Sequence, residues 1–298
     1  MNINGIFPAL TTPFSSDESV SLTAVRENIR RYNDTAIAGF VVLGSTGESV
    51  MLSREEADSI LAASKEVASP QKLLIAGTGA ESTAETIART ERAAALGYPV
   101  ALVKTPYYYK PAYRAETYLR HYRAVADASP IPILLYSVPQ FTGITLETPE
   151  ILKLAEHPNI VGIKDSSGNV QRVAEMVAGA PSKFTVLTGG AAVVYPALTV
   201  GARGAILALA AALPEKCAEV YDLFQRGQHE QARKLQLLLA QASKIIVSEL
   251  GIPGAKYAMD LRGYHGGVSR LPLLPVSEEK KRAIADIVSQ LHPVAASV

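Results

Sequence analysis

The sequence has little of what disulfide, metal or nucleic-acid chemistry requires. A single cysteine, Cys217, occurs among 298 residues, which excludes an internal disulfide framework and is typical of a reducing compartment. The five histidines are scattered, and no two have the spacing of metal ligands, so we expect no metal. Basic residues (29) balance acidic residues (28) and form no long run, so nucleic acid is not an expected partner.

Targeting and membrane signals are also absent from the pattern. The first ten residues, MNINGIFPAL, lack a basic segment followed by a sustained apolar run, so they do not resemble a signal peptide. Residues 184–202 carry no charge and are long enough to cross a bilayer. They contain Gly189, Gly190 and Pro196, however, and we interpret them as buried strand, short helix and strand. The expectation is a cytoplasmic protein without a membrane partner.

The sequence does contain short apolar runs that recur at intervals along the chain. Eight of them are rich in β-branched residues: GIFPALTTPF, GFVVLGSTG, KLLIAGTG, PVALVKTPYYY, IPILLYSVP, IVGIKDSSG, FTVLTGG and GARGAILAL. Segments of helical period separate them, and Ser53 with Glu56 forms a capping box at the start of one. Eight alternating units predict a (β/α)₈ barrel over residues 1–225. Residues 226–298 are predicted to form a C-terminal helical extension packed directly on the barrel.

Active sites of such barrels lie at the carboxyl ends of the strands. The polar residues and glycine expected there are Thr11, Thr12, Ser45, Thr46, Glu48, Thr78, Lys104, Thr105, Tyr107, Tyr108, Tyr109, Tyr136, Lys164, Asp165, Ser166 and Gly189. Hydroxyl groups and two lysines dominate this set, which contains no histidine. The composition favours amine chemistry over metal, phosphoryl or acyl transfer.

Two lysines compete for the role of a buried nucleophile. Lys164 follows Ile160 and Gly162 on one strand face, and Lys104 occupies a similar position on its own strand. A lysine buried among apolar strands can lose its proton and attack a carbonyl. The pattern favours Lys164 only slightly, and the alternative for Lys164 is a surface ion pair with Asp165. Tyr136 is either a core aromatic residue or a proton relay at the barrel mouth.

The segment GSTGES, residues 44–49, resembles a phosphate-binding loop only superficially. It lacks the lysine that would contact the phosphates, and a tight strand-to-helix turn accounts for its glycines. The hydroxyl and backbone N–H groups of such a turn can still bind a small carboxylate.

Three segments together carry a family resemblance. GSTGE (44–48), YSVPQFTG (136–143) and GIKDSSG (162–168) resemble the active-site segments of the dihydrodipicolinate synthase and N-acetylneuraminate lyase superfamily. The resemblance extends over almost the whole chain, from GIFPALTTPF to GIPGAKYAMDLRGYHGG. It implies a (β/α)₈ barrel with a helical extension, assembled as a homotetramer (a dimer of dimers). It also implies a lysine Schiff base to pyruvate or a related 2-oxo acid, without an organic cofactor.

The resemblance assigns roles to individual residues. Lys164 matches the Schiff-base lysine, and Tyr136 matches the tyrosine that moves protons at the imine. Ser45 and Thr46 match paired hydroxyl residues, one in the proton relay and the other on the pyruvate carboxylate. Tyr108 matches a tyrosine that completes this relay in the neighbouring subunit.

The remaining matches concern the substrate. Gly189 and Ile206 match positions that line the pyruvate end of the pocket. Dihydrodipicolinate synthases have arginine two residues after the proline of the tyrosine segment, and here that position is Phe141. An apolar ring cannot replace a bidentate carboxylate clamp. The segment around Ser166, which would bind substrate oxygens, is most similar to that of 4-hydroxy-2-oxoglutarate aldolases.

The expected function is therefore a class I aldolase that cleaves 4-hydroxy-2-oxoglutarate to pyruvate and glyoxylate. Three alternatives stay open at this point: a dihydrodipicolinate synthase, a 2-keto-3-deoxy sugar acid aldolase, and a barrel that binds an oxo acid as a sensor without turnover.

Overall fold

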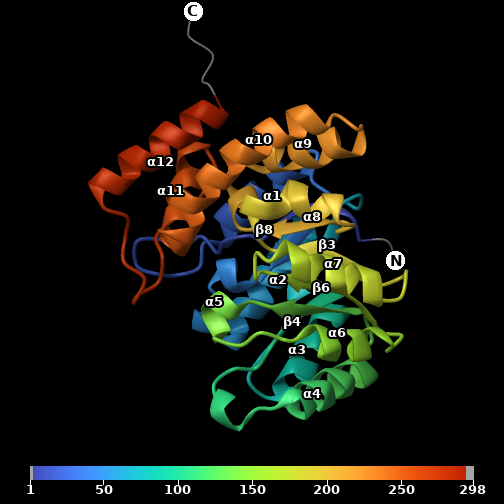
Figure 1. The fold of residues 1–298 in the computed structure, drawn as a ribbon. Coiled ribbons are helices and arrows are strands. Elements are labelled where there is room, and N and C mark those ends of the chain that lie inside the picture. The colour runs from blue at the N-terminus through green and yellow to red at the C-terminus, as the bar shows by residue number, and fades with distance from the viewer. Residues whose placement is uncertain (1–2, 293–298) are drawn as a thin grey trace, which may run out of the picture.

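The computed structural model describes residues 3–292, and its centre is an eight-stranded parallel barrel (Figure 1). The strands are β1 (Gly5–Pro8), β2 (Gly39–Val42), β3 (Leu73–Gly77), β4 (Val100–Lys104), β5 (Ile133–Ser137), β6 (Ile160–Asp165), β7 (Thr185–Thr188) and β8 (Gly204–Leu207). The hydrogen-bonded order runs from β1 through β8 and back down to β2. Closure between β1 and β2 comes from a parallel bridge of Ala9 with Val41 and from the Ala38 N–H, which donates to the Ile6 carbonyl at 2.9 Å. The predicted (β/α)₈ barrel is confirmed.

Helices alternate with the strands and cover the outside of the barrel (Figure 1). They are α1 (Leu22–Asn33), α2 (Arg54–Val67), α3 (Thr83–Ala95), α4 (Ala115–Ala128), α5 (Pro139–Thr142), α6 (Thr148–Ala155), α7 (Val170–Gly179), α8 (Val194–Thr199) and α9 (Pro214–Gln225). The predicted capping box begins α2: the Glu56 N–H donates to the Ser53 hydroxyl, and the Ser53 N–H donates to the Glu56 carboxylate. Such a cap stabilises a helix by about 1 kcal/mol, which fixes where α2 starts after its loop.

The chain continues past the barrel as α10 (His229–Ala242), a π-helical turn (Ser243–Ser248), α11 (Gly251–Leu261) and α12 (Glu278–Leu291). These helices gather on one side of the barrel (Figure 1), and α10 packs against α9. Tyr264, just after α11, stacks on Tyr32 of α1 with ring centroids 4.6 Å apart. A division of the chain at residue 226 stays a prediction, and residues 293–298 of the predicted extension lie outside the described residues.

The barrel interior is filled by apolar side chains from alternate strand positions. The buried cluster contains Ile3, Phe7, Ala9, Val41, Ile75, Val100, Leu102, Leu134, Tyr136, Val138, Leu187 and Ile206. The uncharged segment 184–202 forms β7, a short 3₁₀ turn and α8 of the folded barrel, and the second strand expected within it, β8, begins only at Gly204. Within residues 3–292 no single helix has the length and apolar character to cross a membrane, although the bent pair His229–Ser248 and Gly251–Leu261 meets these limits by length and composition alone.

Candidate active site

The Lys164 side chain lies inside the barrel, and within residues 3–292 it has no counter-ion. Strand register places Lys104, Tyr136, Lys164 and Leu187 in one row across β4 to β7. Lys164 is only 4% exposed, and its Nζ lies 4.2 Å from the centroid of the Tyr136 ring. No carboxylate of the described chain lies within 4 Å of this Nζ. A buried amine that is not engaged in an ion pair is the form in which lysine acts as a nucleophile.

Lys104, the competing lysine, has a different environment. Its Nζ forms an ion pair with the Glu81 carboxylate at 2.9 Å and lies 4.7 Å from the centroid of the Tyr107 ring. Glu81 also accepts hydrogen bonds from the backbone N–H groups of Tyr107 and Tyr108, both at 2.9 Å. These contacts lower the pKa of Glu81 against the raising effect of its burial, so the carboxylate stays charged beside Lys104. Lys104 therefore helps to hold the loop after β4, and the geometry favours Lys164 as the nucleophile.

Asp165 does not pair with Lys164, so the alternative of an ion pair between these neighbours is wrong. Successive side chains of a strand point to opposite faces, and Asp165 points outward from the barrel interior. There the Arg172 Nε donates to its Oδ2 at 3.0 Å, and the Ser167 hydroxyl donates to the same oxygen at 2.9 Å. This buried pair attaches the end of β6 to α7 and leaves the Lys164 amine free.

Tyr136 and Ser45 are brought together from β5 and from the turn after β2. The Ser45 Oγ and the Tyr136 hydroxyl lie 3.4 Å apart, at the outer limit of a hydrogen bond. Ser45 begins a 3₁₀ turn, Ser45–Gly47, and Thr46 is buried in the same turn. The turn therefore brings the Ser45 hydroxyl to Tyr136, over whose ring the Lys164 amine lies, and Thr46 follows Ser45 in the same turn.

Ser166 and Gly189 lie against each other at the ends of β6 and β7, and this pair is called the substrate corner of the candidate site. A methyl group at Gly189 would lie 1.9 Å from the Ser166 Oγ, so only glycine allows this close approach. The Gly189 N–H donates to the Asp165 carbonyl at 2.7 Å, and the Ser166 N–H donates to the Ser137 carbonyl at 2.9 Å. The Gln140 side-chain amide donates to the Ser166 carbonyl. Ser166 is therefore held from β5, α5 and the end of β7.

The other predicted site residues are divided between the core and the surface. Ile206 is buried in the barrel interior on β8. Phe141, on α5, is 63% exposed, and Tyr108 is 71% exposed. Within residues 3–292 the Tyr108 hydroxyl makes no hydrogen bond, so a single chain does not bring it to Tyr136 or Ser45.

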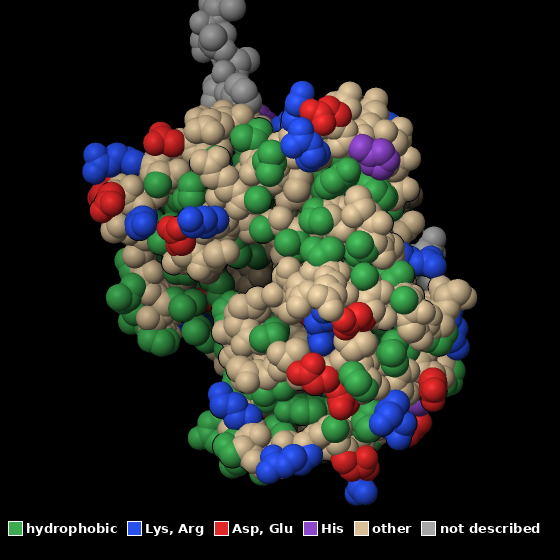
Figure 2. All heavy atoms as spheres, viewed as in Figure 1, with side chains coloured by type: hydrophobic (Ala, Val, Ile, Leu, Met, Phe, Trp, Pro, Cys, Tyr) green, Lys and Arg blue, Asp and Glu red, His purple; other side chains and the backbone are tan. Residues whose placement is uncertain are grey.

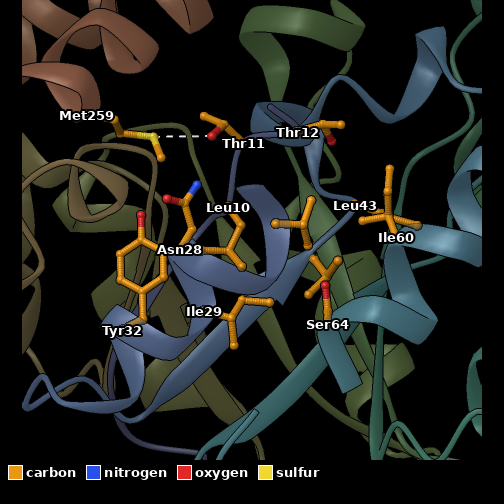
Figure 3. Close-up of a pocket in the computed structure, with 12 residues that line it drawn as sticks. Leu10, Thr11, Thr12, Asn28, Ile29, Tyr32, Leu43, Ile60, Ser64 and Met259 are labelled. Carbon is orange, nitrogen blue, oxygen red and sulfur yellow. Dashed lines mark hydrogen bonds between the residues drawn. The ribbon is translucent and has the colours of Figure 1, made fainter. Parts of the chain in front are cut away.

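Two hollows can be followed in the figures, and the one in Figure 3 is lined by none of Lys164, Tyr136 and Ser45. Figure 2 shows one between the C-terminal helices and the barrel, in the space-filling view. Figure 3 shows residues that line a second cavity. The volume of this cavity is about 10 Å³, which has room for about one water molecule and none for an oxo acid. At its edge the Thr11 hydroxyl donates to the Met259 Sδ at 3.2 Å, which connects α11 to the loop after β1.

Sequence reasoning missed Glu81 and Gln140, which hold segments of the predicted site, and Lys256, whose Nζ lies 2.6 Å from the Glu48 Oε1. Glu81 lies in a polar loop and carries no sign of its contacts with a segment 26 residues away. Gln140 acts through a backbone carbonyl, which leaves no pattern in side-chain types. Lys256 offered a signal, because it is the one charge within the apolar run GIPGAKYAM.

Comparison with known proteins shows the family of the chain. The model of the dihydrodipicolinate synthetase family matches residues 2–291. A 4-hydroxy-tetrahydrodipicolinate synthase from an Exiguobacterium species is 34% identical over 290 residues, covering 97% of this chain and 98% of the relative. The corresponding enzyme from Xanthomonas campestris is 38% identical over 277 residues, covering 93% and 91% of the two chains.

A solved structure gives the same result. The chloride-inhibited dihydrodipicolinate synthase from Acinetobacter baumannii, complexed with pyruvate, superposes with a TM-score of 0.93 at 31% identity, covering 98% of this chain and 100% of the other. The chain belongs to the dihydrodipicolinate synthetase family and is a carbon–carbon lyase of the aldolase type with a lysine Schiff-base mechanism.

Proposed function

We propose that Lys164 is the lysine that forms the Schiff base, with pyruvate or a longer 2-oxo acid as substrate. The Nζ lone pair attacks the 2-oxo carbon, and loss of water gives an iminium that accepts the electrons of the C3–C4 bond of the longer acid. The observation that supports this role is the burial beside the Tyr136 ring of an amine that has no carboxylate partner in the described part of the chain. No metal or organic cofactor takes part in this scheme.

Tyr136 and Ser45 are proposed to move the protons. In the cleavage direction Tyr136 removes the proton of the substrate 4-hydroxyl while the C3–C4 bond breaks and its electrons enter the iminium. The aldehyde leaves, the enamine takes a proton at C3, and water hydrolyses the new iminium to release pyruvate and free Lys164. Thr46 binds the substrate carboxylate through its hydroxyl and the N–H groups of its turn.

Tyr108 is proposed to complete this relay in a second copy of the chain. Its exposure of 71% is large for an aromatic residue, and the loop that carries it is fixed by Glu81 and Lys104. A homotetramer built as a dimer of dimers would cover it. The free and buried Cys217 supports a reducing, cytoplasmic location for this assembly.

The preferred substrate is 4-hydroxy-2-oxoglutarate, cleaved to pyruvate and glyoxylate. The proposal of this substrate rests on Phe141, because its apolar ring occupies the position where a synthase would use arginine to bind the carboxylate of its second substrate. Ser166, pressed against Gly189, contacts substrate oxygens, and Gly189 and Ile206 shape the pyruvate end.

A 4-hydroxy-tetrahydrodipicolinate synthase is the second candidate, because the similar relatives carry that name. Sugar-acid aldolase and non-catalytic sensor functions are weaker alternatives. The test compares kcat/KM for cleavage of 4-hydroxy-2-oxoglutarate with that for condensation of pyruvate and aspartate semialdehyde. At least a tenfold preference for cleavage is expected; the opposite preference overturns the substrate, and no turnover of either compound or of a 2-keto-3-deoxy sugar acid supports the sensor.

A further inference from the structure

An ion pair inside the protein connects the C-terminal extension to the turn after β2, residues 45–48, which we call the catalytic turn. The Lys256 Nζ, on α11, lies 2.6 Å from the Glu48 Oε1, and the two side chains are 2% and 0% exposed. Buried ion pairs rarely stabilise a fold more than well-packed apolar residues of similar volume, because both charges lose their hydration. What such a pair supplies is a defined geometry, since each charge must stay close to the other.

Each partner is held by further contacts. The Arg270 N–H donates to the second carboxylate oxygen of Glu48 at 3.0 Å. The Lys256 ammonium also donates to the Val268 carbonyl at 2.5 Å and lies 4.5 Å from the centroid of the Phe14 ring. The single carboxylate of Glu48 is thus fixed both by α11 and by the loop that follows α11.

Glu48 closes the turn that presents Ser45 and Thr46. Its backbone is left-handed, with φ 53° and ψ 30°, a conformation that is unfavourable for a residue other than glycine and that neighbouring contacts must maintain. Its N–H donates to the Ser45 carbonyl at 3.1 Å. On the other side of the turn the Thr12 hydroxyl donates to the Gly47 carbonyl at 2.7 Å. Displacement of Glu48 would therefore rotate the two hydroxyl residues that precede it.

The same helix makes a second contact at the barrel mouth. Met259, one turn after Lys256, accepts a hydrogen bond from Thr11, the residue next to Thr12 (Figure 3). The α11 helix therefore contacts both the loop after β1, through Met259, and the turn after β2, through Lys256.

We propose that Glu48 and Lys256 are positioning residues for catalysis. Their ion pair docks α11 on the turn and keeps the Ser45 Oγ within reach of the Tyr136 hydroxyl and Thr46 in place for the substrate carboxylate. The roles of Ser45 and Thr46 on which this inference rests are those proposed above. The C-terminal extension is then part of the active-site scaffold.

Four variants of the full chain test this proposal. Glu48→Gln keeps the shape but removes the charge, Lys256→Met removes the amine, and the double variant removes both charges at once. Arg262→Met is the matched control. It breaks an ion pair at the end of the same helix, in which the Arg262 Nη2 lies 3.4 Å from the Glu215 Oε2, and this pair does not contact the turn. The measurements are the melting temperature, kcat and KM for cleavage, and the pyruvate concentration that gives half-maximal borohydride trapping at Lys164.

Both single variants are expected to lose at least about tenfold in kcat/KM and to require about tenfold more pyruvate for half-maximal trapping, since small misplacements of positioning groups have effects of this size. Lys256→Met also melts at a lower temperature, because it leaves Glu48 buried without a partner. In the double variant the melting temperature recovers while the kinetic defect persists. Arg262→Met behaves like the unchanged protein in kcat/KM and in trapping.

Two results would overturn the proposal: unchanged kinetics and trapping in Glu48→Gln, or recovery of both stability and kinetics in the double variant. Loss of trapping in the unchanged protein would be a different failure, because it would refute the proposed role of Lys164 and say nothing of the ion pair.

Discussion

Replacing Gly189 by alanine tests the contact between β7 and the substrate corner. The new methyl carbon would lie 1.9 Å from the Ser166 Oγ, 2.9 Å from its Cβ and 3.0 Å from its Cα. Rotation of the Ser166 side chain relieves only the first of these contacts, so the Ser166 backbone must also move. Overpacking of this kind reduces the free energy of unfolding by about 1–3 kcal/mol.

Gly190→Ala is the matched control for this substitution. A methyl group at Gly190 would lie 3.5 Å from the Val193 Cγ2, which is an ordinary van der Waals contact. Both substitutions reduce the freedom of the unfolded chain and so share a stabilising effect of about 0.4–1 kcal/mol. The difference between the two variants therefore isolates the clash with Ser166.

Calorimetry and a cleavage assay give the two readouts. We expect Gly189→Ala to melt several degrees below Gly190→Ala, at a few degrees per kcal/mol. We also expect its KM for 4-hydroxy-2-oxoglutarate to rise about tenfold, because the displaced Ser166 hydroxyl no longer meets the substrate. Equal melting temperatures and equal KM values in the two variants would refute the assignment of Ser166 and Gly189 to one corner of the site.

Three further predictions concern proton transfer, substrate choice and pH. Tyr136→Phe should lower kcat by about 10²–10⁴-fold, typical of a lost general acid–base group, with borohydride trapping retained; a kcat near that of the unchanged protein contradicts the relay. Phe141→Arg should raise kcat/KM for aspartate semialdehyde condensation at least tenfold relative to 4-hydroxy-2-oxoglutarate cleavage, measured by coupled assays, and an unchanged ratio removes Phe141 as the determinant. Burial, aided by the charge of Lys104, lowers the pKa of His121 from 6.5 to about 4. The unfolded chain therefore takes up this proton first as pH falls, and the free energy of unfolding should drop by about 3 kcal/mol between about pH 6.5 and 4. Denaturant titrations of His121→Gln should show a shallower decline over that window; an identical decline excludes His121 as its source.

The barrel could be predicted because its periodicity is local. Each strand is a short run of β-branched residues, and each helix has an apolar stripe. Ser53 and Glu56, within four consecutive residues, mark the start of a helix. The order of strands then follows because connections between parallel strands are short and right-handed. Lys164 and Lys104 look alike in this pattern, since both end an apolar strand.

The family resemblance of GIKDSSG, and not the periodicity of the strands, distinguishes Lys164 from Lys104 in the sequence, and the contacts that separate the two lysines physically lie far from them along the chain. Lys104 is neutralised by Glu81, 23 residues earlier, whereas the carboxylate next to Lys164 pairs with Arg172 instead. The ion pair of Glu48 with Lys256 spans more than 200 residues and depends on how α11 docks on the barrel. Such contacts are set by tertiary packing, so periodicity and motif spacing carry no record of them.

The central claim is that Lys164 forms the Schiff base, and covalent trapping tests it most directly. The unchanged protein is incubated with pyruvate, reduced with borohydride and digested, and the modified peptide is identified by mass spectrometry. A single adduct on Lys164, absent without pyruvate and absent in Lys164→Met, is the expected result. An adduct on Lys104, or none at all, would contradict the account.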